Sequence, residues 1–162
     1  MNMRRPKSGQ RALRRGRLSL PDHHYLVTTV CDKRRRCFES AKVAACVSGL
    51  LQEQRTWRNS TPICWVLMPD HLHLLLRLAG DESLSNLVNR LKSITARAAT
   101  EAACGFGPVW MRGFHDRAMR DEAECEIAAR YVLENPVCAG LVARAEDYPY
   151  RGCIWEQGAP GW

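Results

Sequence analysis

Two histidines stand two residues apart in the stretch from residue 66 to residue 77, which reads VLMPDHLHLLLR. The apolar residues on both sides of Pro69-Asp70 predict two strands joined by a tight turn, with His71 and His73 on the second strand. Residues two apart on a strand point to the same face, about 6–7 Å from each other. The two imidazoles would therefore stand side by side, in a geometry that can bind one metal ion. A pair of histidines without a metal is the alternative.

Tyr131 and Asn135 are four residues apart on a predicted helix that begins near Asp121 and ends near Asn135, before Pro136. If this helix packs over the histidines, one site would contain two imidazoles, an amide oxygen and a phenol. Such a set could hold a divalent ion that polarises a phosphodiester, with the Tyr131 hydroxyl as the nucleophile. Because tyrosine hydroxyls ordinarily have a pKa near ~10, a metal or a base would have to assist. The alternatives are a core tyrosine and an asparagine that only ends a helix.

The positive charge of the chain is concentrated at its start. Residues 1–17 contain seven Lys and Arg and no acidic residue, and the rest of the chain has 17 basic and 17 acidic residues. This arm suits a polyanion such as nucleic acid, with a solubilising tail as the alternative. No apolar run reaches the ~18–20 residues of a membrane span, and no apolar region follows the basic start. We therefore expect a cytoplasmic protein without membrane attachment, whose eight cysteines are mostly reduced core residues.

The elements that must position the candidate residues occur in the order β-α-β-β-α-β-α. Strands are expected at residues 24–31, 63–68 and 71–78 and within 109–120, and helices at residues 39–55, 84–105 and 121–135. This order predicts an α+β fold of the ferredoxin-like type, a four-stranded antiparallel sheet with helices packed on one face. We expect residues 1–17 to form a flexible arm, residues 18–150 one domain and residues 151–162 a tail, with irregular structure after Cys138.

Three motifs resemble those of the REP-associated tyrosine transposases, relatives of the single-tyrosine HUH transposases of bacterial insertion sequences. They are MPDHLHLLL at residues 68–76, WMRGFHDR at 110–117 and RYVLENPVCAGLV at 130–142. The resemblance covers roughly residues 18–150 and implies that these form the catalytic palm of an HUH nuclease. It implies that His71 and His73 are metal ligands, that Tyr131 forms a 5′-phosphotyrosine with single-stranded DNA, and that Asn135 stands where relatives carry a glutamine ligand. It also implies Mg²⁺ or Mn²⁺ as the metal, and two histidine ligands favour Mn²⁺.

Basic and aromatic side chains are expected to bind DNA, because arginines track phosphates and aromatic rings stack on unpaired bases. These candidates are Arg11, Arg14, Arg15, Arg17, Lys33, Arg34, Arg35, Arg36, Arg90, Lys92, Trp110, Arg112, Phe114, His115, Arg117 and Arg120. For Trp110 and Phe114, core packing is the alternative. Asp70 and Asp116 are candidate partners of the ligand histidines, with a turn and a salt bridge as their alternatives.

Taken together, the residues and the resemblance predict a metal-dependent endonuclease and strand transferase that acts on REP-type palindromic DNA hairpins. No nucleotide cofactor is needed, because the phosphotyrosine link keeps the energy of the bond that is broken. The resemblance further implies a bacterial, nucleoid-associated protein that works as a monomer rather than a homodimer. The alternatives are a hairpin DNA- or RNA-binding protein without chemistry, and a metal-dependent hydrolase of small phosphoesters.

Overall fold

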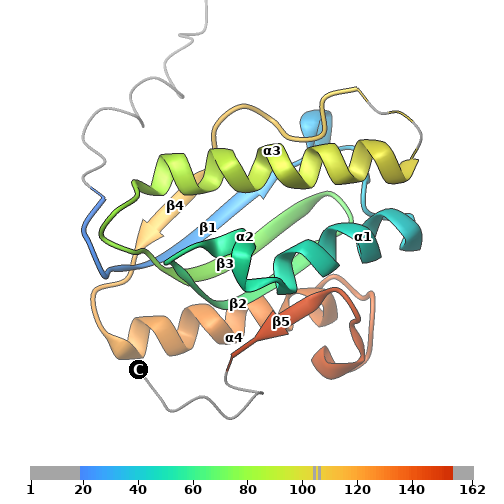
Figure 1. The fold of residues 1–162 in the computed structure, drawn as a ribbon. Helices are drawn as coiled ribbons and strands as arrows, with labels where there is room; N and C mark the ends of the chain where they lie inside the picture. Colours follow the sequence, from blue (N-terminus) through green and yellow to red (C-terminus); the bar gives the residue numbers. More distant parts are fainter. Residues whose placement is uncertain (1–18, 104, 106, 155–162) are drawn as a thin grey trace, which may run out of the picture.

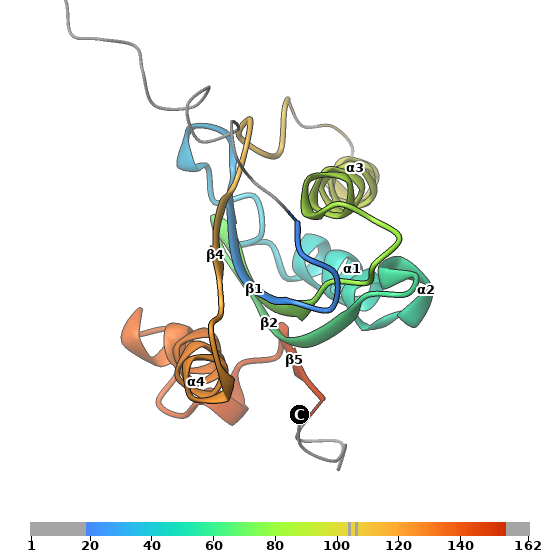
Figure 2. The same ribbon diagram turned by 90° about the vertical axis from the view of Figure 1, so that its left-hand side faces the viewer.

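The computed structural model describes residues 19–103, 105 and 107–154. They form one antiparallel sheet with the strand order β4-β1-β3-β2-β5, covered by helices (Figures 1 and 2). The predicted α+β class and the predicted order of the main elements are confirmed. The strands are β1 His24–Val30, β2 Thr61–Met68, β3 His71–Arg77, β4 His115–Ala118 and β5 Arg151–Cys153. The α-helices are α1 Ala41–Gln52, α2 Gln54–Trp57, α3 Leu84–Ala103 and α4 Glu122–Cys138, and the 3₁₀ helices are η2 Asp32–Arg34 and η3 Ala145–Asp147.

Strand β3 is the centre of the sheet and carries both histidines. It pairs with β1, where Thr28 lies opposite His73, and with β2, where Val66 lies opposite His73. Strands β2 and β3 are buried along most of their length. Because both faces of the sheet are covered here, these two strands are nearly continuous apolar runs rather than alternating ones.

Helices α1 and α3 lie side by side on the first face of the sheet (Figure 2). Alternate residues of the strands point into the core beneath them. The sheet residues of this core are Tyr25, Val27, Trp65, Leu67, Leu72, Leu74 and Leu76.

No described helix is both long enough and apolar enough to cross a membrane.

Helix α4 lies on the second face, so the prediction that all helices pack on one face is wrong (Figure 2). Its inward side is built from small residues, among them Ala128 and Ala129, which allow the helix to approach β2 and β3 closely. These pack on the strand residues that point away from the first core, such as Val66 and Leu75. Helical periodicity identifies the apolar side of a helix but does not assign it to a face of the sheet. The histidines of β3 point to this second face.

Within the described part of the chain the sheet has five strands, one more than predicted. The region after α4, which was expected to be irregular, adds β5 to the outer edge of β2, with Gly152 opposite Trp65. A Cβ atom on Gly152 would lie only 2.6 Å from Nε1 of Trp65. Glycine is therefore required where β5 crosses this buried indole.

Side-chain caps lie at the starts of α3 and α4, close to the residues where the sequence predicts these helices to begin. Ser83 Oγ accepts a hydrogen bond from the Asn86 N–H at 3.2 Å, and Asp121 Oδ1 accepts one from the Glu124 N–H at 2.8 Å. Each cap satisfies a backbone donor that has no partner within the helix. The second cap fixes the start of the helix that carries Tyr131.

The predicted end of α4 at Asn135 is wrong, because the helix continues to Cys138 with Pro136 inside it. A proline removes its own N–H from the helical pattern, but its carbonyl and its neighbours' groups can still bond. Here the Asn135 carbonyl accepts the Ala139 N–H at 3.0 Å, which closes the last turn. Asn135 therefore lies inside the helix, one turn after Tyr131.

Candidate active site

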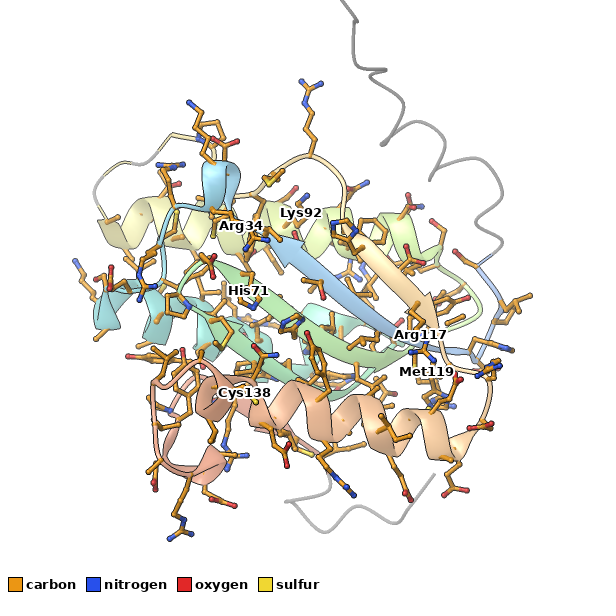
Figure 3. The ribbon with its side chains drawn as sticks, turned by 180° about the vertical axis from the view of Figure 1, so that it is seen from behind. Arg34, His71, Lys92, Arg117, Met119 and Cys138 are labelled. Carbon is orange, nitrogen blue, oxygen red and sulfur yellow. The ribbon has the colours of Figure 1, made fainter. Side chains whose placement is uncertain are left out.

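The two histidines of β3 converge on one point above the second face of the sheet. Figure 3 labels His71 there. Their Nε2 atoms are 3.1 Å apart, and the rings meet edge to face with centroids 4.6 Å apart. His73 is buried, with 6% of its surface exposed, whereas His71 is half-buried at the rim. The strand therefore presents two imidazole nitrogens to the same small volume.

Each imidazole is held by a contact to its other nitrogen. Nδ1 of His71 lies 2.6 Å from Oδ1 of Asp70, and Nδ1 of His73 lies 2.8 Å from Oγ1 of Thr28 on β1. A carboxylate accepts the Nδ1 proton of His71, which leaves the Nε2 lone pair for a ligand. Thr28 was not predicted from the sequence. The sequence shows only that Thr28 is a polar residue in a predicted strand. Identifying it as the partner of His73 requires the register between β1 and β3.

Burial, followed by the charge of His71, lowers the pKa of His73 to about 4. His73 is therefore neutral at pH 7, as a metal ligand must be. Partial burial alone would raise the pKa of the Asp70 carboxyl, but its hydrogen bond to His71 and the charges of His71 and Arg34 outweigh burial and lower it. Asp70 is thus ionised at pH 7 and can hold the His71 ring in one tautomer.

Tyr131 reaches this site from α4. Its ring lies edge-on to His73, with centroids 5.2 Å apart, and half of the residue's surface is exposed. The phenol is therefore exposed to solvent on a packed helix while its ring touches that of His73. Asn135, half-buried one turn later, lies on the same side of α4.

The donor atoms fit a divalent metal ion. A separation of 3.1 Å between the Nε2 atoms is close to that of two adjacent nitrogen ligands about 2.1 Å from one ion. Both rings are oriented through Nδ1, as ligand histidines usually are. Within the described ranges no cluster of three His, Cys, Asp or Glu could hold a metal. Asn135, on the side of α4 that carries Tyr131, is the candidate for a further protein ligand.

Asp116 does not belong to this site. It lies opposite Val27 in the β1–β4 pairing, whereas its neighbour His115 lies opposite Thr28. Because side chains alternate along a strand, Asp116 points to the face covered by α3 and cannot contact the histidines. The exposed His115 instead continues the row formed by Thr28 and His73 on the second face.

The basic loop after β1 contributes one arginine to the edge of the site. Nη1 of Arg34 lies 3.4 Å from Oδ2 of Asp70. Lys33 and Arg34 both have a positive φ, 54° and 53°, a conformation that costs a non-glycine residue about 1–2 kcal/mol. In the same loop Arg35 donates to the Pro108 carbonyl, and Arg36 pairs with Glu39.

The other predicted DNA contacts divide between the core, internal bonds and the exposed surface. Arg90, on the far face, pairs with Glu82 at 2.7 Å. Lys92 donates to the carbonyls of Met111 and Gly113 at 2.6 and 2.8 Å. Both side chains thus support the fold. The predicted arm residues Arg11, Arg14, Arg15 and Arg17 lie outside the described residues.

The predicted aromatic segment is mostly internal. Trp110 is 9% exposed, and its indole N–H donates to Thr95 Oγ1 at 3.0 Å. This burial leaves the indole no open face on which a base could stack. Phe114 is half-buried against the first core.

Arg112, Arg117 and Arg120 are exposed, and the last two hold the carboxylate of Glu124 at the start of α4. Figure 3 shows Arg117 on the same side of the molecule as His71. Arg117 alternates with Asp116 along β4 and so shares the second face with His115. The exposed side chains of His115 and Arg117 therefore share a face of the sheet with the histidine site.

The chain is similar in sequence to known transposases. A family model described as "Transposase IS200 like" matches residues 19–135, a range that contains His71, His73, Tyr131 and Asn135. A REP-associated tyrosine transposase of Escherichia coli K12 is 29% identical over 87 residues, which cover 53% of this chain and 50% of that protein. A protein of Haemophilus influenzae is 28% identical over 102 residues, 57% of each chain. The chain thus spans about half the length of the curated relatives it matches.

The fold has a close counterpart among solved structures. The structure of a REP-associated tyrosine transposase bound to a REP hairpin matches it with a TM-score of 0.67 and 21% sequence identity. The match covers 90% of this chain and 88% of that chain. At this identity the likeness establishes a shared fold.

Proposed function

Because the chain belongs to the IS200-like transposase family, we propose that it cleaves and rejoins single-stranded DNA through Tyr131, at hairpins of the REP type. The resemblance predicted from the three sequence motifs is confirmed by the family match and by the relatives. The observation that carries the proposal is the position of Tyr131, whose ring lies 5.2 Å from His73 on an open face. A tyrosine that served only the core would be buried.

The chemistry follows from the groups that meet at the site. The Tyr131 oxygen forms a bond to phosphorus, the bond from phosphorus to the 3′ oxygen breaks, and the released 3′ hydroxyl takes a proton. The tyrosine hydroxyl loses its proton, so one phosphodiester is exchanged for another. The reverse reaction with a 3′ hydroxyl rejoins a strand without an energy source.

His71, His73 and the Asn135 amide would hold a divalent ion, Mg²⁺ or Mn²⁺. Such an ion, when bound, supplies Lewis-acid polarisation of the phosphate. Asp70 and Thr28 orient the two imidazoles so that Nε2 faces the substrate side. We expect Mn²⁺ to support the higher rate, because nitrogen ligands suit it better than Mg²⁺.

Hairpin DNA is the proposed substrate, and it is the ligand named for the solved relative. The exposed basic residues near the site on the second face, Arg34, His115 and Arg117, would contact its phosphates together with the N-terminal arm. We propose that one copy of the chain suffices for cleavage, since the nucleophile and the imidazoles come from the same molecule.

A covalent-adduct assay tests the proposal. Labelled single-stranded hairpin DNA is incubated with the protein and Mn²⁺ or Mg²⁺, denatured in detergent and separated on a gel. A metal-dependent shifted band is expected for the wild type and for the matched control Tyr150→Phe, and no band for Tyr131→Phe or His71→Ala. Tight hairpin binding without an adduct would instead indicate a binding protein without chemistry.

A further inference from the structure

Arg34 places a positive charge at the rim of the histidine pair. One oxygen of Asp70 contacts His71 at 2.6 Å, and the other contacts the Arg34 guanidinium at 3.4 Å. A single carboxylate therefore links Arg34 to a candidate metal ligand. Figure 3 labels Arg34 and His71. The Arg34 side chain is 71% exposed, so a substrate can reach it.

The backbone holds Arg34 in a fixed relation to His71. Both ends of its loop are bonded to the turn before β3: the Cys31 N–H donates to the Asp70 carbonyl at 2.8 Å, and the Phe38 N–H to the Pro69 carbonyl at 2.9 Å. The Arg34 N–H itself donates back to the Cys31 carbonyl at 2.9 Å. The loop and the histidine strand thus form one unit.

The guanidinium has capacity that the fold does not use. It carries five N–H donors, and among the described residues its only side-chain hydrogen bond is the long one to Asp70. By contrast, Arg35 is committed to the carbonyls of Pro108 and Asp32. A planar guanidinium with unused donors is suited to bind two oxygens of a phosphate.

We infer that Arg34 binds the phosphate that Tyr131 attacks and compensates the charge on its nonbridging oxygens as the bond to the 3′ oxygen breaks. The inference rests on the proposed function and adds a residue to its chemistry. In this arrangement Asp70 has two tasks, since one oxygen orients His71 and the other orients Arg34. The loop after β1 is then part of the active site rather than a general DNA-binding surface.

A binding experiment locates the phosphate independently of cleavage. Hairpin oligonucleotides carry one neutral methylphosphonate each, moved stepwise along the single strand, and their affinities are measured for the wild type, Arg34→Gln and Arg97→Gln. Arg97 is an exposed arginine of α3, paired with Glu101, and serves as the matched control. The neutral linkage at the attacked phosphate should weaken binding by the wild type and Arg97→Gln about tenfold, and by Arg34→Gln less than about threefold.

Kinetics then separate a direct contact from an effect through Asp70. At saturating DNA, Arg34→Gln should form the adduct at least about tenfold more slowly than Arg97→Gln, and Arg34→Lys should recover part of the rate. Adding Arg34→Gln to the Asp70→Asn variant should slow adduct formation further. Equal rates in Asp70→Asn with and without Arg34→Gln would overturn the inference, because Arg34 would then act only by positioning Asp70.

The two proposals fail in different ways. If the wild type forms no adduct, the proposed function fails, and the methylphosphonate series still reports whether Arg34 contacts one particular phosphate. The inference is overturned, even in an active enzyme, if the methylphosphonate weakens binding by Arg34→Gln and by the wild type equally at every position. It is also overturned if the two proteins differ at a phosphate other than the one found in the adduct.

Discussion

Replacing Thr28 by valine should weaken metal binding without unfolding the protein. The substitution keeps the shape of the side chain and removes the hydroxyl that contacts Nδ1 of His73 at 2.8 Å. A hydrogen bond of this kind contributes about 0.5–1.5 kcal/mol net, and groups that orient a ligand histidine typically change metal affinity 10- to 100-fold. We therefore expect the dissociation constant for Mn²⁺ to rise about tenfold, which corresponds to ~1.4 kcal/mol.

The neighbouring Thr29 provides a matched control. It lies on the opposite face of β1, is 3% exposed, and its Oγ1 has no hydrogen-bond partner among the described residues. Thr29→Val removes a buried hydroxyl that bonds to nothing, so it should leave Mn²⁺ affinity unchanged and raise stability by up to about 1–2 kcal/mol. The two variants thus make the same chemical change on opposite sides of one strand.

The measurements are a Mn²⁺ titration followed by calorimetry or electron paramagnetic resonance, and thermal unfolding of the metal-free protein. The expected result is weaker Mn²⁺ binding in Thr28→Val with a melting temperature within a few degrees of the wild type. If Thr28→Val binds Mn²⁺ as tightly as the wild type and Thr29→Val do, the contact to His73 does not orient a metal ligand. Thr28 would then be a structural neighbour of His73 that does not affect metal binding.

Three further outcomes are expected. Glu124→Gln should destabilise the protein at pH 7 but not near pH 2. Hydrogen bonds from Arg120 lower the pKa of Glu124 from 4.5 to about 2, so the stability that this carboxylate contributes is present above pH 4.5 and is lost as the pH falls through 2. Urea unfolding across this pH range measures the difference. Lys92→Met should lower the free energy of unfolding, measured by calorimetry, by about 2 kcal/mol, because the hydrogen bonds to the carbonyls of Met111 and Gly113 are lost. Its affinity for hairpin DNA should stay within twofold of the wild type, and a large loss of affinity would make Lys92 a DNA contact. Gly152→Ala should cost about 1–3 kcal/mol through its clash with Trp65, and an unchanged melting temperature would contradict this packing.

The parts of the site that depend on local periodicity could be predicted from the sequence. Strand alternation placed His71 and His73 on one face, and the helical spacing placed Tyr131 and Asn135 on one side of α4. Each pair needs only the geometry of its own element. The predictions of the turn before β3 and of the starts of α3 and α4 also depended on local sequence alone.

The parts that depend on how elements pair could not be predicted. Thr28 reaches His73 because of the register between β1 and β3, and Asp116 misses the site because of the register between β1 and β4. A shift of one residue would exchange these outcomes, and nothing within a single strand specifies it. Trp110 could be placed in the core only by knowing that Thr95 of α3 accepts its N–H.

The lengths of the outer strands have a consequence for self-association. The sheet is bordered by β4, with four residues, and β5, with three. An edge strand offers unpaired backbone groups to any other extended chain, and a long, flat, apolar edge is a template for aggregation. These two edges offer only a few such groups, and β4 carries a basic side chain at Arg117. The face that carries the histidines can therefore stay exposed, while the edges of the sheet offer a second polypeptide few backbone groups to pair with.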